Sequence, residues 1–233
     1  MKIISNPKKI QRYYKIGMYT SFGALIFLFG AVALTVYTAQ RPDLQNYPFV
    51  LMLFGLVLSQ IGVYFANRWG KSPRVDERIT ASLKGLDDRY TLYHYTSPVP
   101  HLLVGPAGVW VLVSQYHPGT ITYENKRYHQ KGVGLFARFI GQEAISRPDV
   151  EAQAYQEDMQ RFLKKSLPVN SLPPVQTAIV FTSPKSTVSA AEAPISTLHV
   201  DKLKDFLRRK LKEQPVSLAD FHRIQEVLPK EEV

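Results

Sequence analysis

The sequence predicts an α/β protein, in which an N-terminal transmembrane helical hairpin precedes a mixed sheet flanked by helices. Two uncharged apolar runs, 16–37 and 49–67, predict the hairpin. At 1.5 Å per residue the first run extends about 33 Å, enough to cross a hydrocarbon core of about 30 Å. Helix and strand patterns that alternate from residue 76 onward predict the sheet and its helices.

The connection between the two runs is a short polar turn with two prolines, at 39–48. A cleaved signal peptide is disfavoured, because the first run exceeds a usual h-region and a second run follows closely. Burial of both runs in a soluble core is also disfavoured, because neither has a polar face. Ser59 and Gln60 interrupt the second run, and we expect them to face the partner helix.

The charges around the runs predict their orientation. Five cations and no acidic residue precede the first run, and three cations follow the second, whereas the turn carries only Arg41 beside Asp43. By the positive-inside rule, both termini and the soluble domain are expected in the cytoplasm, with the protein a multi-pass cell-membrane protein. The lipid bilayer is thus the first expected partner. The flanking cations are Lys2, Lys8, Lys9, Arg12, Lys15, Arg68, Lys71 and Arg74.

The remaining chain predicts a mixed sheet between helices. Helical spacing predicts helices over 76–86, 148–165, 202–212 and 218–228. Apolar, aromatic or Thr-rich runs predict strands over 90–96, 99–104, 109–115, 120–123, 127–129, 175–181 and 195–200. The segment 132–141 is expected to be a loop with an apolar tip, whose role stays open. The predicted divisions are a basic N-terminus (1–15), the hairpin (16–67), a linker (68–75), a domain (76–212) and a C-terminal helix and tail (213–233).

The segment 99–119 resembles the central hairpin of the nuclease-related domain, or NERD, family. The resemblance is carried by His101-Leu-Leu-Val-Gly-Pro-Ala-Gly-Val-Trp-Val111, with support from Gly119, Tyr128 and the pair Gln153-Ala154. It covers about Asp76 to Leu211, most of the soluble part. It implies a restriction-endonuclease-like fold with a metal-dependent nuclease site.

The residues that the family uses for this chemistry are replaced. An Asp is expected where Pro100 stands, a Glu where Val113 stands and a Lys where Gln115 stands. Mg²⁺ prefers hard oxygen ligands, and the phosphate charge that develops in the reaction needs a nearby cation. The resemblance therefore predicts a catalytically degenerate domain with no catalytic residues, no metal and no cofactor.

A displaced nuclease site is the main alternative, and only this alternative would need Mg²⁺. Glu124 and Lys126 repeat the Glu-x-Lys spacing, but Asn125-Lys126 is also natural turn chemistry between two short strands. Glu77 is more typical of a first-turn helix charge. Asp87 and Asp88 are further carboxylates, at the end of the first predicted helix of the domain.

The amino-acid composition excludes several other kinds of functional site. The chain has no cysteine, which excludes disulfides, thiolate zinc sites and cysteine nucleophiles. Its histidines show no metal-binding spacing, and His101 is expected to be a structural residue. The net charge of +10 leaves weak nucleic-acid binding open, although the cations of 202–212 fit a solvated helix face. A binding or scaffolding role at the membrane, with a protein partner, is therefore expected. The alternatives are a membrane-tethered nuclease and a structural subunit that assembles through its hairpin.

Overall fold

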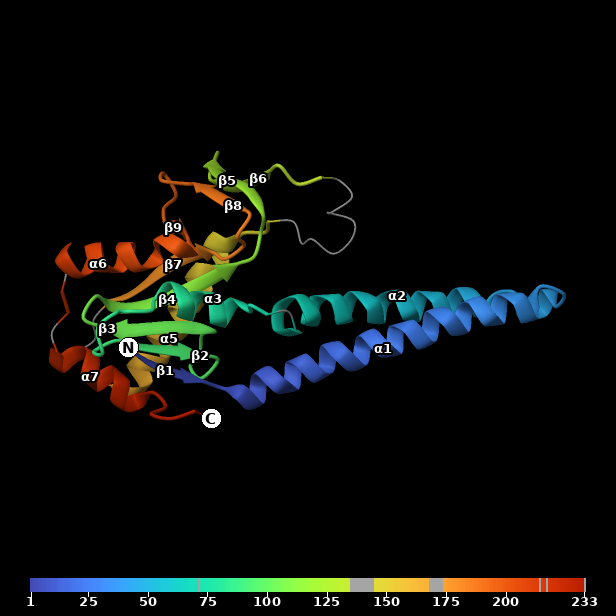
Figure 1. The fold of residues 1–233 in the computed structure, drawn as a ribbon, viewed down its shortest axis with the longest axis horizontal. Coiled ribbons are helices and arrows are strands. Elements are labelled where there is room, and N and C mark those ends of the chain that lie inside the picture. The colour runs from blue at the N-terminus through green and yellow to red at the C-terminus, as the bar shows by residue number, and fades with distance from the viewer. Residues whose placement is uncertain (71, 135–144, 168–173, 214, 217, 233) are drawn as a thin grey trace. The chain divides into compact units, whose positions relative to one another are not determined.

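The computed structural model describes residues 1–70, 72–134, 145–167, 174–213, 215–216 and 218–232. They form two compact units. One unit combines Met1–Pro7 with Val75–Val233, and the other is Lys8–Arg74. The chain thus begins in the sheet domain, leaves it for a helical hairpin, and returns to it (Figure 1).

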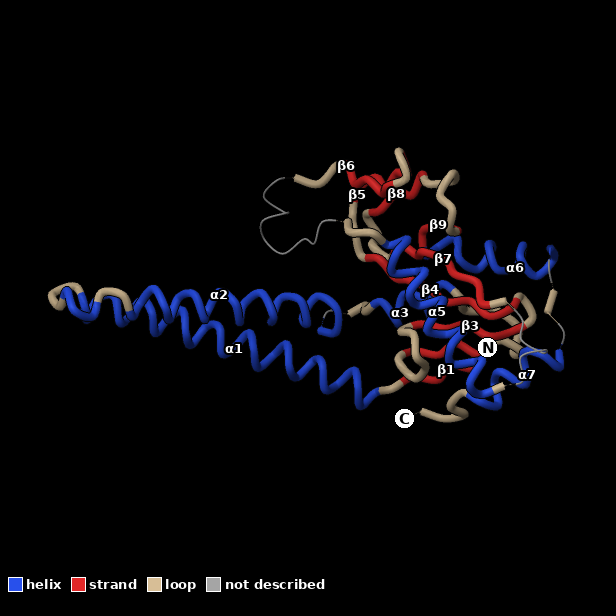
Figure 2. The backbone as a smooth tube through the Cα atoms, turned by 180° about the vertical axis from the view of Figure 1, so that it is seen from behind, coloured by secondary structure: helices blue, strands red, loops and turns tan. Residues whose placement is uncertain are grey.

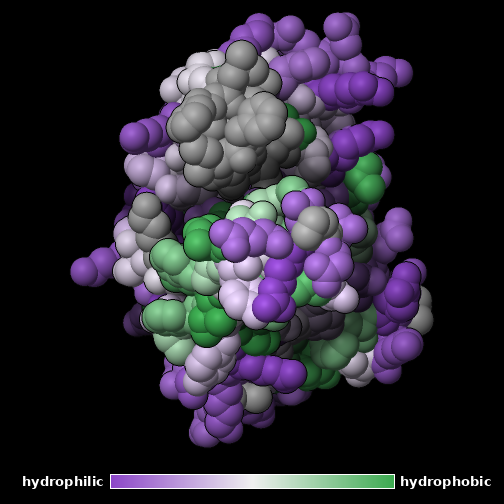
Figure 3. All heavy atoms as spheres, turned by 90° about the vertical axis from the view of Figure 1, so that its right-hand side faces the viewer, coloured by the Kyte–Doolittle hydropathy of each residue, from purple (hydrophilic) through white to green (hydrophobic). Residues whose placement is uncertain are grey.

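The helical hairpin consists of α1 (Pro7–Thr38) and α2 (Tyr47–Phe65), joined through a 3₁₀ turn at Pro42–Leu44. A π-helical turn, Ala66–Gly70, continues α2. Both helices are long and apolar enough to cross a membrane. Figure 3 faces the end of the hairpin and shows hydrophobic residues at the surface around its polar turn. The predicted hairpin is confirmed, with α1 beginning nine residues before the predicted span.

Small residues form the seam between the two helices at intervals of seven. The buried residues are Gly17, Ala24, Ala31 and Thr38 on α1, and Pro48, Gly55 and Gly62 on α2. A Cβ added to Gly55 would lie 2.8 Å from Leu28 Cγ and 3.3 Å from Leu28 N. The two backbones therefore approach closely, as small residues permit in membrane helix pairs. A seven-residue period keeps one seam in register along a left-handed supercoil.

The domain is built on a six-stranded sheet with the order β1-β2-β3-β4-β7-β9 (Figures 1 and 2). Its strands are β1 (Lys2–Ser5), β2 (Thr91–His94), β3 (His101–Gly105), β4 (Gly108–Gln115), β7 (Val175–Phe181) and β9 (Ser196–His199). The pairings β1–β2, β4–β7 and β7–β9 are parallel, and only β3 is antiparallel to its neighbours. Five strands consequently end at one edge of the sheet.

Helices cover both faces of this sheet. The strand β4 alternates between them, with Val109, Val111 and Val113 in one core cluster and Trp110 and Leu112 in the other. The first cluster includes residues of α5 (Pro148–Ser166) and α7 (Leu218–Val227). The second includes residues of α3 (Val75–Ser82) and α6 (Leu203–Glu213). Burial on both faces explains why β4 reads as a nearly continuous apolar run. The predicted mixed sheet with flanking helices is confirmed.

A second sheet has the order β6-β5-β8. It consists of β5 (Gly119–Glu124), β6 (Arg127–Lys131) and β8 (Ser186–Ser189). The strands β5 and β6 form the predicted short hairpin. Asn125 and Lys126 between them both have positive φ, 51° and 60°, as a tight two-residue turn requires.

The structure differs from the sequence prediction at three places. Residues 1–15, expected as one basic segment, divide between strand β1 and the start of α1. The strand β8 was not expected. Gln60, which we expected to face the partner helix, is exposed on α2. The predicted loop 132–141 lies mostly outside the described residues.

Candidate functional site

The carboxyl edge of the parallel strands gathers polar side chains that are far apart in sequence. His94 ends β2, Gln115 ends β4 and His199 ends β9, while His101 begins the antiparallel strand β3. The register pairs His94 with His101, and Phe181 at the end of β7 with both Gln115 and His199. In open α/β sheets, ligands bind at this edge. It is therefore the candidate functional site.

Gln115, one of the positions that the NERD resemblance singles out, has a hydrogen-bond contact at each end of its amide. Its Nε2 donates to Glu151 Oε2 at 2.7 Å, and its Oε1 lies 3.2 Å from His117 Nε2. The backbone carbonyl of Gln115 also accepts from Thr182 N at 2.9 Å. Gln115 and His117 are both buried, and the His117 ring packs beside Phe181. Position 115 thus holds a Glu–Gln–His hydrogen-bond chain in which Gln115 and His117 are buried.

Glu151 was not singled out from the sequence. It lies in the first turn of α5, where an acidic residue is explained by the helix dipole alone. Its neighbour Asp149 has a lowered pKa, because Arg147 donates a hydrogen bond to its carboxylate. The contact between Gln115 and Glu151 joins residues 36 apart in sequence. No spacing or motif signals such a contact, so only the folded chain reveals it.

The other two positions that the resemblance singles out, 100 and 113, hold no polar side chain. Val113 is 1% exposed within the first hydrophobic core cluster and pairs with Ile179 on β7. Pro100 precedes β3, and its carbonyl accepts a hydrogen bond from Tyr95 N at 2.8 Å. Tyr95 has φ 61°, so the six-residue connection between β2 and β3 begins with a left-handed residue. Position 113 therefore carries a hydrocarbon side chain, and the only polar group at position 100 is the backbone carbonyl.

A pair of histidines lies on the opposite face of the same edge. His94 Nδ1 and His101 Nδ1 are 2.8 Å apart, and His94 Nε2 is 2.9 Å from Thr80 Oγ1 on α3. Both histidines are buried, with 2% and 1% of their surface exposed. One Nδ1 must donate and the other accept, which fixes complementary tautomers. His101 therefore lies in the core with a hydrogen-bond partner, the setting of a structural histidine.

The carboxylates considered for a displaced metal site are spread over separate elements. Glu77 lies in the first turn of α3. Glu124 ends β5 in the second sheet, where its Oε1 lies 3.8 Å from Lys131 Nζ, and Lys126 belongs to the adjoining turn. Within the described residues, no three His, Asp or Glu side chains lie close enough together to hold a metal ion. The structure does not bring these candidates together.

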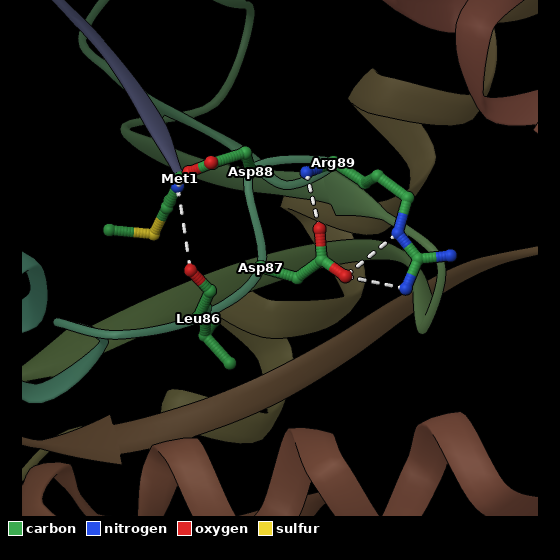
Figure 4. A network of polar contacts seen from close by, with 5 residues as sticks. All are labelled: Met1, Leu86, Asp87, Asp88 and Arg89. Carbon is green, nitrogen blue, oxygen red and sulfur yellow. Dashed lines mark hydrogen bonds and ion pairs between the residues drawn. The ribbon is translucent and has the colours of Figure 1, made fainter.

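Asp87 and Asp88 are engaged in a network that holds the start of the chain (Figure 4). The α-ammonium of Met1 contacts Asp88 Oδ1 at 2.6 Å and donates to the Leu86 carbonyl at 3.4 Å. Arg89 donates from its backbone and its guanidinium to Asp87. These hydrogen bonds lower the pKa of Asp87 to about 2. Asp88 thus anchors the start of the chain, and Asp87 holds Arg89 beside it.

A groove of about 810 Å³ lies where β8, β9 and α6 meet. Serine, threonine and alanine residues make up much of its lining, and His199, Lys202 and Arg209 add cationic or titratable groups. His199 Nε2 lies 3.0 Å from the Ser183 carbonyl, and its Nδ1 lies 3.2 Å from Asp201 Oδ2. Along α6, Arg208 pairs with Asp205 and Lys210 with Glu213. Part of the basic charge expected on this helix is thus neutralised locally.

The chain was compared with family models, curated proteins and solved structures, and it matches none of them. Two long apolar helices and a mixed α/β domain are established by the structure itself, while the resemblance to the NERD family stays a prediction.

Proposed function

We propose that this chain is a membrane-anchored binding or scaffolding protein whose NERD-like, restriction-endonuclease-like domain has lost metal-dependent catalysis. The observation that carries the proposal is the state of Gln115. Its amide is buried and bonded to Glu151 and His117, at the position where the family places its Lys. A neutral amide whose nitrogen already donates to Glu151 and whose oxygen already contacts His117 offers no cation to a phosphate group and is a poor oxygen ligand for Mg²⁺.

The surrounding residues support the same proposal. Val113 presents only hydrocarbon, and Glu151 is the carboxylate that contacts Gln115. One carboxylate alone is a weak site for a divalent metal. Mg²⁺ held by a single carboxylate also needs substrate phosphates as ligands. Glu151 is therefore the residue through which any remaining nuclease activity is best tested.

The test is a cleavage assay with the full chain in detergent or nanodiscs, on single- and double-stranded DNA and on RNA, with Mg²⁺ or Mn²⁺. We expect no metal-dependent cleavage above that of a Glu151→Gln control. Binding of the same nucleic acids, measured against salt concentration, reports the expected weak affinity separately. Cleavage that disappears in Glu151→Gln, Glu124→Ala or Glu77→Ala would establish the nuclease alternative.

Insertion of the hairpin into a membrane is part of the proposal, with both termini and the domain in the cytoplasm. Its support is the cation distribution and the return of the chain to the same sheet, since β1 and β2 pair in parallel on either side of the hairpin. The chain has no cysteine, so single engineered cysteines report topology cleanly. In intact cells, a membrane-impermeant maleimide should label Asp43→Cys, and Glu231→Cys only after permeabilisation. The reverse pattern would contradict the orientation.

A second candidate function is a structural subunit that assembles through its hairpin. The observation that favours it is the exposure of Gln60, a polar residue in the middle of the apolar surface of α2.

A further inference from the structure

The amide of Gln60 is the unusual polar group of the hairpin. It lies two residues, about 3 Å, from the midpoint of the predicted span 49–67. The side chain is exposed, and in the part of the chain that the structure describes it takes part in no hydrogen bond. If the hairpin is inserted, this amide faces hydrocarbon, where an unbonded amide costs several kcal/mol.

The hydroxyls of α1 show how polar groups in this hairpin are otherwise satisfied. Thr20, Thr35 and Thr38 each donate to the carbonyl four residues earlier, at 2.8 Å. A glutamine cannot use this local route as readily, because its longer side chain carries two donors and an acceptor. The Gln60 amide therefore needs a partner from outside the hairpin.

Gln60 also lies on the face of α2 that the hairpin leaves open. Two residues correspond to about 200° around a helix, so Gln60 lies nearly opposite Gly62 of the seam. Leu53, Leu56, Val57 and Tyr64 share this outward face and are all exposed. Residues 53 and 60 are one heptad apart, residues 56–57 lie between them, and residue 64 follows one helical turn after Gln60. This face, residues 53, 56, 57, 60 and 64, is called the Gln60 face below.

We propose that the Gln60 face binds the same face of a second copy of this chain. Copies with one topology in a membrane are related by rotation about the membrane normal. Their α2 helices can then run parallel, and the two Gln60 residues lie at the same depth. An amide is self-complementary, because the oxygen of each can accept from the nitrogen of the other. A single polar residue in an apolar heptad face also fixes register and oligomeric state.

This inference rests on the proposed membrane insertion, so the experiment first establishes insertion by alkaline carbonate extraction. The full chain then carries a single cysteine at Leu53 or at Phe54, which are exposed to similar extents at adjacent depths. Oxidative cross-linking in membranes should give a homodimer band with Leu53→Cys. Phe54→Cys, about 100° further around the helix, should give little.

Gln60→Leu in the Leu53→Cys background should weaken dimerisation about five- to thirty-fold, the range of interhelical side-chain hydrogen bonds in model membranes. Gln60→Asn keeps an amide and should retain most of the dimer. An inserted chain that cross-links equally at both cysteines, or is unaffected by Gln60→Leu, overturns the dimer and leaves the membrane anchor standing. A cross-link to a different protein overturns the choice of a second copy. A chain released by carbonate overturns both proposals.

Discussion

The strand that precedes the hairpin should contribute measurably to the stability of the domain. Ile3 and Ile4 are adjacent on β1, yet Ile4 is 2% exposed within the core and Ile3 is 42% exposed. Truncation of a buried Ile to Ala typically costs about 2–5 kcal/mol, and β1 is an edge strand that can partly relax. For Ile4→Ala we therefore expect a loss of about 3 kcal/mol, near the lower end. Ile3→Ala should change stability by about 0.5 kcal/mol or less.

The assay is thermal unfolding of the full chain in detergent. Trp110 is buried in the domain core and Trp69 lies in the hairpin unit, so a Trp69→Phe background makes fluorescence report the domain. A loss of about 3 kcal/mol should lower Tm by about 6–12 °C for a domain of this size. Equal shifts for Ile3→Ala and Ile4→Ala, or no shift for either, would refute the pairing of β1 with β2.

Three further perturbations have expected outcomes. Gly62→Leu should separate α1 from α2 and lower the melting temperature of the hairpin helices by circular dichroism, because its Cβ would lie 3.0 Å from the backbone nitrogen of Ser21. Gly23→Leu, whose Cβ meets only a Leu58 methyl at 3.9 Å, should be tolerated, and equal effects would contradict the close approach. Burial raises the pKa of Tyr93 to about 12, so the folded state favours the neutral phenol. The stability it contributes should be present below pH 10 and lost as pH rises toward 12, a loss that Tyr93→Phe should reduce in unfolding measured across this range. Gln115→Glu would set a second carboxylate against Glu151 and should destabilise the domain by about 1–3 kcal/mol. Mg²⁺ should restore the Tm of this variant only, and an equal gain in the unmutated chain would contradict the proposed loss of metal binding.

Periodicity allowed most of the fold to be predicted from the sequence. The apolar runs that became α1, α2, β4 and β7 are long and bury large faces, so their composition reports their environment directly. The strand β8 has the sequence Ser-Thr-Val-Ser, with alternately half-buried and exposed residues and little apolar content, and it forms because β5 offers it a parallel partner. Its existence depends on a neighbour 67 residues away, which no local pattern encodes.

The candidate site likewise has one part that the sequence could indicate and another that depends on contacts between distant residues. The predicted resemblance to the NERD family singled out Pro100, Val113 and Gln115, because a resemblance fixes positions along a strand. It could not supply the partner of Gln115, since Glu151 comes from a helix on the far side of a long connection. The His94–His101 pair likewise depends on the antiparallel register of β2 and β3, in which the two residues are direct partners. The resemblance predicts which positions to inspect, whereas the contacts of the residues that stand there required the packing.

The position of β1 bears on how the hairpin and the domain depend on each other. Asn6 is the one residue between the end of β1 and the start of α1. Because β1 and the later strands share one sheet, both ends of the hairpin must lie on the same side of any membrane that it crosses. An even number of crossings is therefore required by the fold, independently of the flanking cations. Removal of the first apolar run by cleavage would also detach β1 from the domain and expose the edge of β2. The sheet thus argues for an uncleaved hairpin on grounds that hydropathy alone does not provide.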